Sequence, residues 1–562
     1  MEMTGAEIIC RILKNEGVRY LFGVPGYTEV PLLHTLARIS GIRYISAAHE
    51  SVSVGMADGY ARASGQVGIV LVHTTPGAAN IIGNLYNAYN AGTPLMVIAG
   101  LQDSRLQWGD PSLDSDLLPM VTQYTKSRWR VSRAEDIARA LHRALKEAIT
   151  PPTGPVFLSV PRDLQSQSVS LDESSLRRII VPVEVVPGRE LLKEAAQLLA
   201  DASKPAIFAG HAVPDAGAIP ELVNLAEELA SPVYTSSQVS KLIFPTNHPL
   251  YYGKVGMTSA SMLQMSGSAD VLLVLGSNVF KQIDYADTPL IAPTTKVIQV
   301  DLDPQGLGKY CPTEVAIVAS PKHALGELAT EISQLMSTDQ RRKCHQRLKQ
   351  LENARREAKV TQDREFKKDW EVLPIRPWRA IKDIAAVLPS STVVVDEAVM
   401  LTSYVSNIME FTEPGSYFNC NAYLGWGLPA SLGVALGTTR RPVVAIIGDG
   451  SALFGLQAMW TATKYQIPVI MLVLNNHGYA AIRWSLMMYG KMMSEEVNTT
   501  DYDLGEVNIS KLAAAFDIDT WQIERPAEIR PALEKAIALN KPALLEIMVD
   551  PKDLGYARSR LS

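Results

Sequence analysis

The chain has 562 residues, roughly three to five times the length of one ordinary domain, so we expect a multidomain protein. Hydrophobic residues make up 47% and charged residues 20%, values typical of packed globular proteins, which excludes a disordered or fibrous chain. With 53 Lys and Arg against 58 Asp and Glu, the net charge is −5. This balance gives no basic surplus for a phosphate backbone, and we expect no nucleic acid partner.

The cysteines and the apolar runs bear on where the protein works. The four cysteines lie far apart, without the density of a disulfide framework or the spacing of a metal site, which favours a reducing cytoplasm. The charged amino terminus does not resemble a signal peptide. The longest apolar runs, such as residues 469–474, are too short to span a membrane, so we expect no membrane partner.

Helix and strand signals alternate along the chain. Thr4 and Glu7 form a capping-box pattern ahead of a periodic apolar stretch, which predicts an opening helix. Short runs that are apolar on both faces follow, separated by helix-length segments, and this rhythm indicates parallel sheets covered by helices. We therefore predict an α/β protein with three doubly wound domains in series. The predicted strands are residues 20–23, 44–47, 67–72, 94–99 and 156–160, then 206–209, 271–275 and 296–300, then 392–395, 443–447, 469–474 and 543–549.

Two polar segments indicate the domain boundaries. Residues 165–184 are polar and acidic without a clear period, as is typical of a linker. Residues 341–368 carry eleven Lys and Arg against four Asp and Glu, which we interpret as a solvated helix joining two domains rather than an anion-binding face. The predicted divisions are an N-terminal domain at 1–180, a central domain at 185–335, a charged linker at 336–375 and a C-terminal domain at 376–562.

A glycine-rich turn in the C-terminal domain carries the strongest chemical signal. Gly448, Asp449, Gly450 and Ser451 follow the apolar strand 443–447 directly and precede a helical stretch. Free backbone amides at such a turn, together with the helix dipole, attract a phosphate group. Taken alone, however, the turn is also common in proteins that bind no phosphate.

A second polar turn ends the next predicted strand. Residues 469–474 run into Asn475, Asn476, His477 and Gly478, and parallel strands end at the same edge of a sheet. Asp449 and Asn476 can therefore meet over one ion. A carboxylate, an amide oxygen and a backbone carbonyl, completed by phosphate and water oxygens, suit the octahedral preference of Mg²⁺.

The two turns together resemble a known motif. A Gly-Asp-Gly turn followed after 24 residues by two asparagines is similar to the diphosphate and magnesium motif of the thiamine diphosphate enzymes. The resemblance implies three domains: an N-terminal domain that binds the pyrimidine, a central domain, and a C-terminal domain that binds the diphosphate. It also implies that Mg²⁺ binds to the Asp449 and Asn476 side chains and the Gly478 carbonyl, with Gly448, Gly450 and Ser451 at the diphosphate.

The same family requires a glutamate in its N-terminal domain, and the segment from Ala48 to Arg62 resembles the family's helix that begins with it. Glu50 alone could be an ordinary acidic residue in a first helical turn, which stabilises the dipole by about 0.3–1 kcal/mol. Beside the diphosphate motif we favour a catalytic role. The resemblance implies that Glu50 contacts N1′ of the cofactor's aminopyrimidine, so that the 4′-imino group can remove the proton from thiazolium C2.

A third segment resembles the family's cofactor wedge. Residues 421–430 resemble the stretch in which a large aliphatic side chain bends the cofactor into its V shape. The resemblance places Leu424 at the wedge and implies that the Ala422 carbonyl accepts a hydrogen bond from the 4′-amino group. An isolated leucine at this place would be read simply as a core residue.

The substrate pocket is predicted less sharply. His73 falls on an active-site histidine of the benzoylformate decarboxylase branch, which the stretch from Tyr479 to Trp484 also resembles most, and Tyr27 and Trp484 are candidates for the pocket wall. A strand-end histidine that merely bonds to the backbone is the alternative for His73. That branch has a serine at the position of Tyr27 and a second histidine where this chain has Lys281 and its neighbours, which argues against benzoylformate itself.

The resemblance implies an enzyme that uses thiamine diphosphate and Mg²⁺ to cleave or form a carbon–carbon bond next to a carbonyl. The favoured reaction is decarboxylation of a 2-oxo acid, with acyloin formation when an aldehyde is the acceptor. The alternatives are an acetolactate-synthase-like carboligase with a structural FAD, which the favoured branch does not require, a 2-hydroxyacyl-CoA lyase, and an inactive nucleotide-binding relative. The resemblance also implies a homo-oligomer, at least a dimer, because family members share the cofactor between subunits, and we expect a dimer of dimers, that is, a tetramer.

Overall fold

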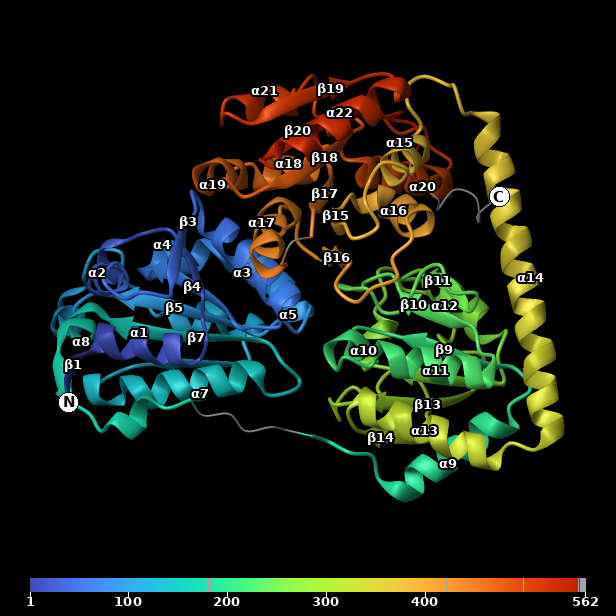
Figure 1. Cartoon of the computed structure of the whole chain (residues 1–562), viewed down its shortest axis with the longest axis horizontal. Coiled ribbons are helices and arrows are strands. Elements are labelled where there is room, and N and C mark those ends of the chain that lie inside the picture. Colours follow the sequence, from blue (N-terminus) through green and yellow to red (C-terminus); the bar gives the residue numbers. More distant parts are fainter. Residues whose placement is uncertain (179–183, 421, 440, 499, 554, 556–562) are drawn as a thin grey trace. The chain divides into compact units, whose positions relative to one another are not determined.

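The computed structural model describes residues 1–178, 184–420, 422–439, 441–498, 500–553 and 555 (Figure 1). Three six-stranded sheets and one two-stranded ribbon organise these residues. The prediction of three α/β domains with parallel sheets is confirmed. No helix in the described part of the chain is both long enough and apolar enough to cross a membrane.

The N-terminal sheet has the order β3-β2-β4-β5-β7-β6, with all neighbours parallel. Its strands are β2 (Tyr20–Gly23), β3 (Arg43–Ser46), β4 (Gly68–His73), β5 (Leu95–Leu101), β6 (Ser127–Arg130) and β7 (Pro155–Pro161). The helices around it are α1 (Gly5–Asn15), α2 (Val30–Leu36), α3 (Glu50–Ser64), α4 (Thr74–Asn80), α5 (Ile82–Asn90), α6 (Leu117–Val121), α7 (Ile137–Ile149) and α8 (Arg162–Ser166).

Both faces of this sheet are buried, which explains why its strands are continuously apolar. Val70 and Val72 pack on the face that also contains residues of α3 and α5. Ile69 and Leu71, which alternate with them, pack with residues of α1 and α7 on the other face. The predicted opening helix is confirmed, because Thr4 and Glu7 form the reciprocal capping box of α1.

The C-terminal sheet has the order β16-β15-β17-β18-β20-β19. Its strands are β15 (Val393–Glu397), β16 (Tyr417–Asn419), β17 (Val443–Gly448), β18 (Val469–Asn475), β19 (Asp519–Ile523) and β20 (Ala543–Met548). Its helices are α15 (Pro377–Ala385), α16 (Thr402–Ile408), α17 (Gly427–Gly437), α18 (Asp449–Gly455), α19 (Ala458–Tyr465), α20 (Ala480–Met493), α21 (Ile509–Ala514) and α22 (Pro526–Leu539). Counted along the chain, the strand order 2-1-3-4-6-5 is the same in both sheets, so two domains share one topology.

The central sheet has a different order, β11-β10-β9-β12-β13-β14, which is 3-2-1-4-5-6 along the chain. This is the order of the dinucleotide-binding fold. Its strands are β9 (Pro205–Ala209), β10 (Val233–Ser236), β11 (Tyr251–Val255), β12 (Val271–Leu275), β13 (Lys296–Asp301) and β14 (Val315–Val318), and its helices are α9 (Arg189–Asp201), α10 (Ala212–Asp215), α11 (Ile219–Leu229), α12 (Ser259–Ser266) and α13 (Pro321–Leu335).

The basic segment after the central domain forms one long helix, α14 (Thr338–Lys368). Phe366 is its one buried residue, and most of the helix is exposed to solvent. Arg347 attaches α14 to the central domain by donating to the carbonyls of Leu229, Ala230 and Ser203. The basic residues of α14 are therefore exposed to solvent or attach the helix to the central domain, which agrees with the interpretation of this segment as a solvated helix.

The segment predicted as a structureless linker contains a strand. Residues Ser168–Ser170 form β8, which pairs antiparallel with β1 (Glu2–Thr4). The sequence did not indicate this strand, because β8 is only three residues long, with one buried side chain, Val169, between two exposed serines. An alternation of three residues is too short to give a periodic signal. The strand β8 is stabilised by its pairing with β1.

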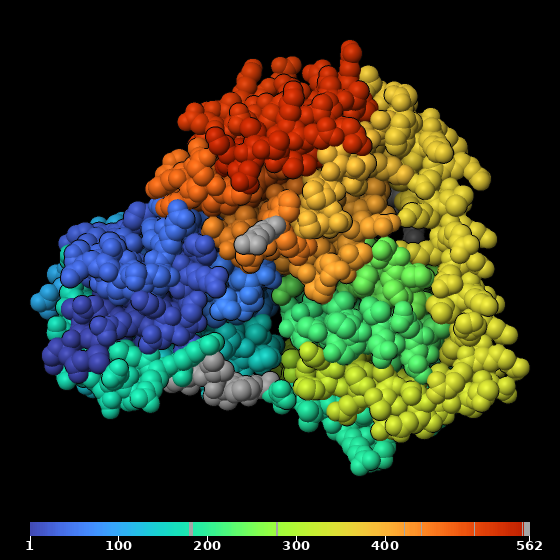
Figure 2. Space-filling view, viewed as in Figure 1, coloured from blue at the N-terminus to red at the C-terminus, as the bar shows by residue number. Residues whose placement is uncertain are grey.

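The chain forms two compact units, and the N- and C-terminal sheets belong to the same one. Within that unit α3 packs directly on α17, and in Figure 2 the blue and orange segments meet along a continuous surface. Glycines allow the close approach: a Cβ on Gly433 would lie 1.9 Å from the Met56 carbonyl oxygen, and one on Gly59 would lie 2.2 Å from that of Ala430.

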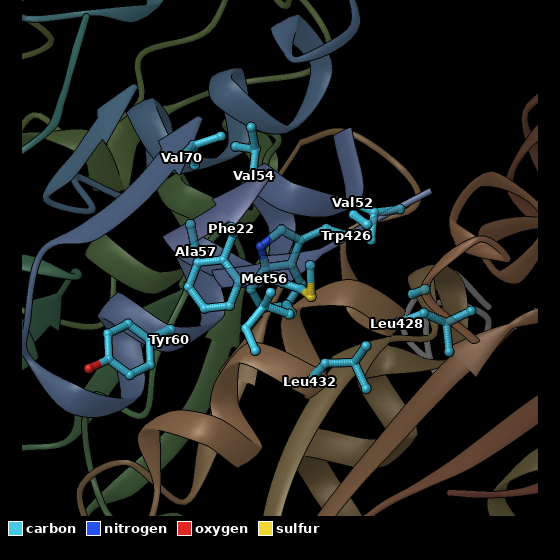
Figure 3. Close-up of a cluster of buried hydrophobic side chains, with 14 of the residues drawn as sticks. Phe22, Val52, Val54, Met56, Ala57, Tyr60, Val70, Trp426, Leu428 and Leu432 are labelled. Carbon is cyan, nitrogen blue, oxygen red and sulfur yellow. The ribbon is translucent and has the colours of Figure 1, made fainter. Parts of the chain in front are cut away.

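A shared apolar core and a buried ion pair hold α3 and α17 together. Val52, Met56 and Tyr60 from α3 lie in one cluster with Trp426 and Leu428 (Figure 3). Beside this cluster, Asp58 accepts from Arg62 at 2.6 and 2.8 Å and from the indole Nε1 of Trp426 at 2.6 Å. The Arg62 guanidinium also stacks 4.5 Å from the Trp426 ring. The carboxylate is thus fully bonded without solvent, across the boundary of the two domains.

Candidate active site

The two glycine and asparagine turns lie side by side. β17 and β18 are parallel neighbours, with Gly448 opposite Leu474, so both strands end at the same edge. Asp449 starts α18 there, where its Oδ1 accepts from the Gly450 amide at 2.9 Å and its Oδ2 accepts from the Gly478 amide at 3.0 Å. Burial raises the pKa of Asp449, against the lowering effect of these two amides. A buried carboxylate that must be ionised favours a nearby cation.

The two adjacent asparagines have different partners. Asn475 is used by the fold, because its amide donates to Glu546 Oε1 at 2.7 Å and its oxygen accepts from the His477 amide at 2.9 Å. Asn476 instead lies under the guanidinium of Arg483, which donates to its carbonyl at 3.0 Å. His477 adopts φ +60°, the left-handed conformation that turns the chain back toward Asp449.

These residues fit a Mg²⁺ ion in the chemistry of their donors. The Asp449 carboxylate, the Asn476 amide oxygen and the Gly478 carbonyl are hard oxygen donors, the kind that Mg²⁺ prefers. Among the described residues, no group of three or more His, Cys, Asp or Glu side chains gathers as a metal cage. A site with one carboxylate agrees with the habit of Mg²⁺ to keep water and phosphate oxygens as its other ligands.

Glu50 begins α3 directly after β3, at the carboxyl edge of the N-terminal sheet. His49 caps the helix, since its Nδ1 accepts from the Ser51 amide at 3.1 Å. Glu50 Oε2 accepts from the side-chain amide of Asn80 at 2.9 Å, which fixes the carboxylate on one side. Within the described part of the chain, the other oxygen, Oε1, accepts no hydrogen bond, so it can accept one from a nitrogen of a ligand.

His73 lies at the end of β4, beside a buried acid that the sequence-based prediction missed. Its Nδ1 is 2.8 Å from Thr28 Oγ1 and 3.5 Å from Glu29 Oε2. The Glu29 carboxylate beside the imidazole raises the pKa of His73, although partial burial acts in the opposite direction and the charge of Glu50 adds a smaller increase. Thr28 also donates to Glu29 Oε1. The imidazole is thus held by a threonine and a carboxylate, a pairing suited to a proton carrier.

Glu29 is completely buried, and its Oε2 makes no hydrogen bond within the described structure. Gly100 leaves the space for its carboxylate, because a Cβ there would lie 2.0 Å from Glu29 Oε1. The sequence holds no signal for it, because an acid in a turn after a strand is ordinarily exposed to solvent.

The predicted wedge segment precedes α17 and is held by a second buried acid. Glu397, the last residue of β15, accepts from the amides of Gly425 at 2.6 Å, Trp426 at 3.3 Å and Gly427 at 2.6 Å. Burial raises the pKa of Glu397 to about 8, against the lowering effect of these amides. Leu424 lies immediately before these residues and is partly exposed, as is required of a side chain that supports a ligand.

Two pocket candidates are less tightly built in. Tyr27 is 60% exposed, and the guanidinium of Arg162 lies 4.2 Å from the centre of its ring. Trp484 lies on α20 next to Arg483 and is partly exposed. Ala422 is exposed beside Leu424, while Gly448, Gly450 and Ser451 lie with Asp449 at the turn into α18.

Comparison with known proteins agrees with this arrangement. Three family models match: the N-terminal thiamine pyrophosphate (TPP) binding domain of thiamine pyrophosphate enzymes at residues 3–117, their central domain at 192–328 and their C-terminal TPP binding domain at 398–547. Benzoylformate decarboxylase of Pseudomonas aeruginosa is 30% identical, over 95% of this chain and 97% of its own. A probable acetolactate synthase large subunit of Methanocaldococcus jannaschii is 29% identical, over 98% and 93%.

Solved structures are similar over the whole chain. A thiamine diphosphate-dependent 4-hydroxybenzoylformate decarboxylase of Rhodococcus jostii superimposes with a TM-score of 0.86 at 25% identity, covering 98% of this chain and 100% of that one. A putative thiamin diphosphate-dependent enzyme of Mycobacterium smegmatis gives 0.84 at 28% identity, with the same coverage.

Proposed function

Since the chain belongs to the thiamine pyrophosphate-dependent enzymes, we propose that it is a Mg²⁺-requiring lyase that decarboxylates a 2-oxo acid and can join the product to an aldehyde. The observation that carries the proposal is the 3.0 Å hydrogen bond from the Gly478 amide to Asp449, which unites the two halves of the diphosphate motif at one sheet edge. The proposed active unit is at least a homodimer, and we expect two such dimers to form a tetramer.

The residues have separate tasks in this proposal. Asp449, Asn476 and the Gly478 carbonyl hold Mg²⁺, and the turn of Gly448, Gly450 and Ser451 accommodates the diphosphate. When bound, the cofactor supplies an acidic thiazolium carbon and a ring that accepts the electron pair released with CO₂.

The N-terminal domain handles protons. Glu50 binds the pyrimidine nitrogen and favours the tautomer that can act as a base, with Asn80 fixing the orientation of its carboxylate. His73, with its pKa raised by Glu29, gives or takes the proton of the substrate-derived groups. Leu424 supports the bend of the cofactor and the Ala422 carbonyl accepts from its amino group, while Tyr27 and Trp484 line the pocket.

Thermal unfolding tests the proposal first. Thiamine diphosphate with Mg²⁺ should raise the melting temperature of the apoprotein, since a ligand at about 100 times its Kd adds about 2.7 kcal/mol. A panel of 2-oxo acids, alone and with aldehydes, is then scored for CO₂ and acyloin. No shift with cofactor and metal would refute the whole assignment, and binding without CO₂ release from any acid would refute the decarboxylase.

A second candidate is an acetolactate-synthase-like carboligase with a structural FAD. Two observations favour it: the similarity to the methanogen relative and the dinucleotide-type strand order of the central sheet. Against it, the turn after β9 has Gly210, His211 and Ala212 and lacks the glycine pattern of a dinucleotide site. A visible flavin absorbance of the purified protein, with acetolactate formed from pyruvate, would favour this candidate over the first.

A further inference from the structure

Three asparagines line one face of the helical segment that follows His73. Asn80 is the last residue of α4, and Asn84 and Asn87 belong to α5, which begins after Ile81. Their spacing of four and three residues places them on one side of a helix. Exposure falls along the row, because Asn80 is exposed whereas Asn84 and Asn87 are 1% and 0% exposed. Buried amides need partners, so the row has defined contacts.

The first two asparagines hold the beginning of α3. Asn80 donates to Glu50 Oε2 at 2.9 Å. Asn84 donates to both the carbonyl and the hydroxyl of Ser51 at 2.9 Å, and its own oxygen accepts from Asn87 at 2.9 Å. The helical segment therefore fixes both the backbone and the side chain at the position of Glu50.

Asn87 reaches across to the C-terminal domain. Its Oδ1 accepts from the Tyr423 amide and its Nδ2 donates to the Tyr423 carbonyl, both at 2.8 Å. The Asn87 side chain thus bonds to both the backbone N–H and the backbone carbonyl of Tyr423, as a neighbouring β-strand would. It also fixes which way the Asn87 amide points, since only one orientation matches both partners. The ring of Tyr423 lies over Gly83, where a Cβ would be 2.4 Å from it.

The wedge residue is thereby held from both sides. Asn87 holds Tyr423, the residue before Leu424, and Glu397 accepts from the amides of the three residues after it. Leu424 itself has no side-chain bond that could fix it, so its position depends on these two neighbours.

We infer that α4 and α5 form one positioning element, in which Asn80 orients the Glu50 carboxylate and Asn87 fixes the backbone before Leu424, so that the Leu424 side chain can support the cofactor. Asn80 and Asn87 act through Glu50 and Leu424 and are positioning residues. The inference rests on the proposed function, because it takes Glu50 and Leu424 to contact thiamine diphosphate. If the proposed dimer shares each cofactor between chains, the Glu50 and Leu424 of one chain serve different sites, and the helical segment positions one group in each. That segment joins the two cofactor-binding domains of the same chain.

The test compares Asn87→Asp with wild type in the full-length protein. The substitution keeps the shape of the side chain but places an oxygen against the Tyr423 carbonyl and Asn84 Oδ1, so two hydrogen bonds become repulsive contacts. We expect the Kd for thiamine diphosphate with Mg²⁺ to rise at least tenfold and kcat to fall at least tenfold, with a smaller change in KM for the 2-oxo acid. The near-ultraviolet circular dichroism of the bound cofactor, which reports its aminopyrimidine tautomer, should change as well.

Asn90→Ala is the matched control, because Asn90 continues the same helix and donates to the Tyr86 carbonyl of its own turn. It should behave as wild type in all four measurements. Asn80→Ala tests the other end of the row on an exposed position whose loss should leave the melting temperature unchanged. We expect it to lower kcat about tenfold and to shift the tautomer signal, while the cofactor Kd stays within a factor of three.

The outcomes separate the inference from the proposed function. If wild type does not bind the cofactor, the proposed function fails. If wild type binds it and a folded Asn87→Asp protein has unchanged Kd, kcat and circular dichroism, the positioning role of Asn87 is wrong. Should Asn87→Asp fail to fold, Asn80→Ala decides: unchanged kcat and tautomer signal would overturn the inference, and the expected pair of changes would support it.

Discussion

The N-terminal and C-terminal sheets share one strand order but present different chemistry at matching strand ends. A buried acid lies near the carboxyl end of the first strand of each: Glu29 follows β2 in a short turn, and Glu397 is the last residue of β15. After β3 the chain places Glu50, and after β16 it places the segment of Leu424. The comparison teaches that topology fixes where groups converge, at the carboxyl edge, whereas the side chains there decide the chemistry.

The third strand of each sheet shows the division most clearly. β4 ends in His73, whose environment stabilises a proton on the imidazole, and β17 is followed directly by Asp449, whose environment suits a cation. One edge is therefore suited to proton transfer and the other to the metal and diphosphate. Loss of a group from each edge should have a different consequence, and the following tests use that difference.

Asp449→Ala should have the largest effect. Without the carboxylate that joins the two turns, Mg²⁺ loses its charged ligand and the diphosphate loses its anchor. We expect the melting temperature shift produced by cofactor and Mg²⁺ to disappear. Isothermal titration that still gave the wild-type Kd would contradict the assignment.

Glu50→Gln should separate the two edges. The amide is nearly isosteric and Asp449 is intact, so the cofactor should still bind. Turnover should fall by about 10²–10⁴-fold, the usual size of a general acid–base contribution. Near-normal kcat in a variant with normal cofactor affinity would remove Glu50 from the mechanism.

Asp58→Ala should lower the stability of the contact between the N- and C-terminal domains, without removing a group proposed to act in catalysis. It leaves Arg62 and the Trp426 indole without their buried partner, and such a loss costs about 3–5 kcal/mol. Denaturant unfolding measures the change. As a control, Asp103→Ala removes the surface pair with Arg105, which should cost at most about 1 kcal/mol. Equal losses in the two variants would contradict the buried pair's role.

Mixing inactive Glu50→Gln and Asp449→Ala proteins tests whether one site uses edges from two chains. If it does, exchange of subunits creates sites with both wild-type edges, and activity should return to about one quarter of all sites in random dimers. Mass spectrometry of the assemblies shows whether exchange has occurred. Exchange without recovered activity would place the whole site within one chain.

Glu29→Gln should have the smallest effect, visible as a pH dependence. Because Glu29 raises the pKa of His73, the pair stabilises the fold below the ordinary histidine pKa of about 6.5, and this stabilisation is lost as pH rises through the raised value. The variant should therefore lose more stability at pH 5.5 than at pH 8. In the pH profile of kcat, the limb that reflects His73 titration should move to lower pH. An unchanged limb would show that Glu29 does not tune His73.

The fold class and the meeting of the two turns that we propose to hold the metal could both be predicted from the sequence. Apolar runs such as residues 443–447 are local signals, and the two turns after β17 and β18 lie at neighbouring strand ends in any parallel sheet that pairs those strands. Short or edge strands such as β6, β8 and β19 escaped prediction because each buries few side chains and depends on its neighbour for stability.

The partners of the proposed catalytic groups became visible in the three-dimensional structure alone. Glu29 meets His73 across 44 residues of chain, and Asn87 meets Tyr423 across 336. Glu397 satisfies amides about 30 residues further along the chain. Such contacts leave no local pattern, because a buried polar side chain is specified by the geometry of the segments packed around it and not by its sequence neighbours.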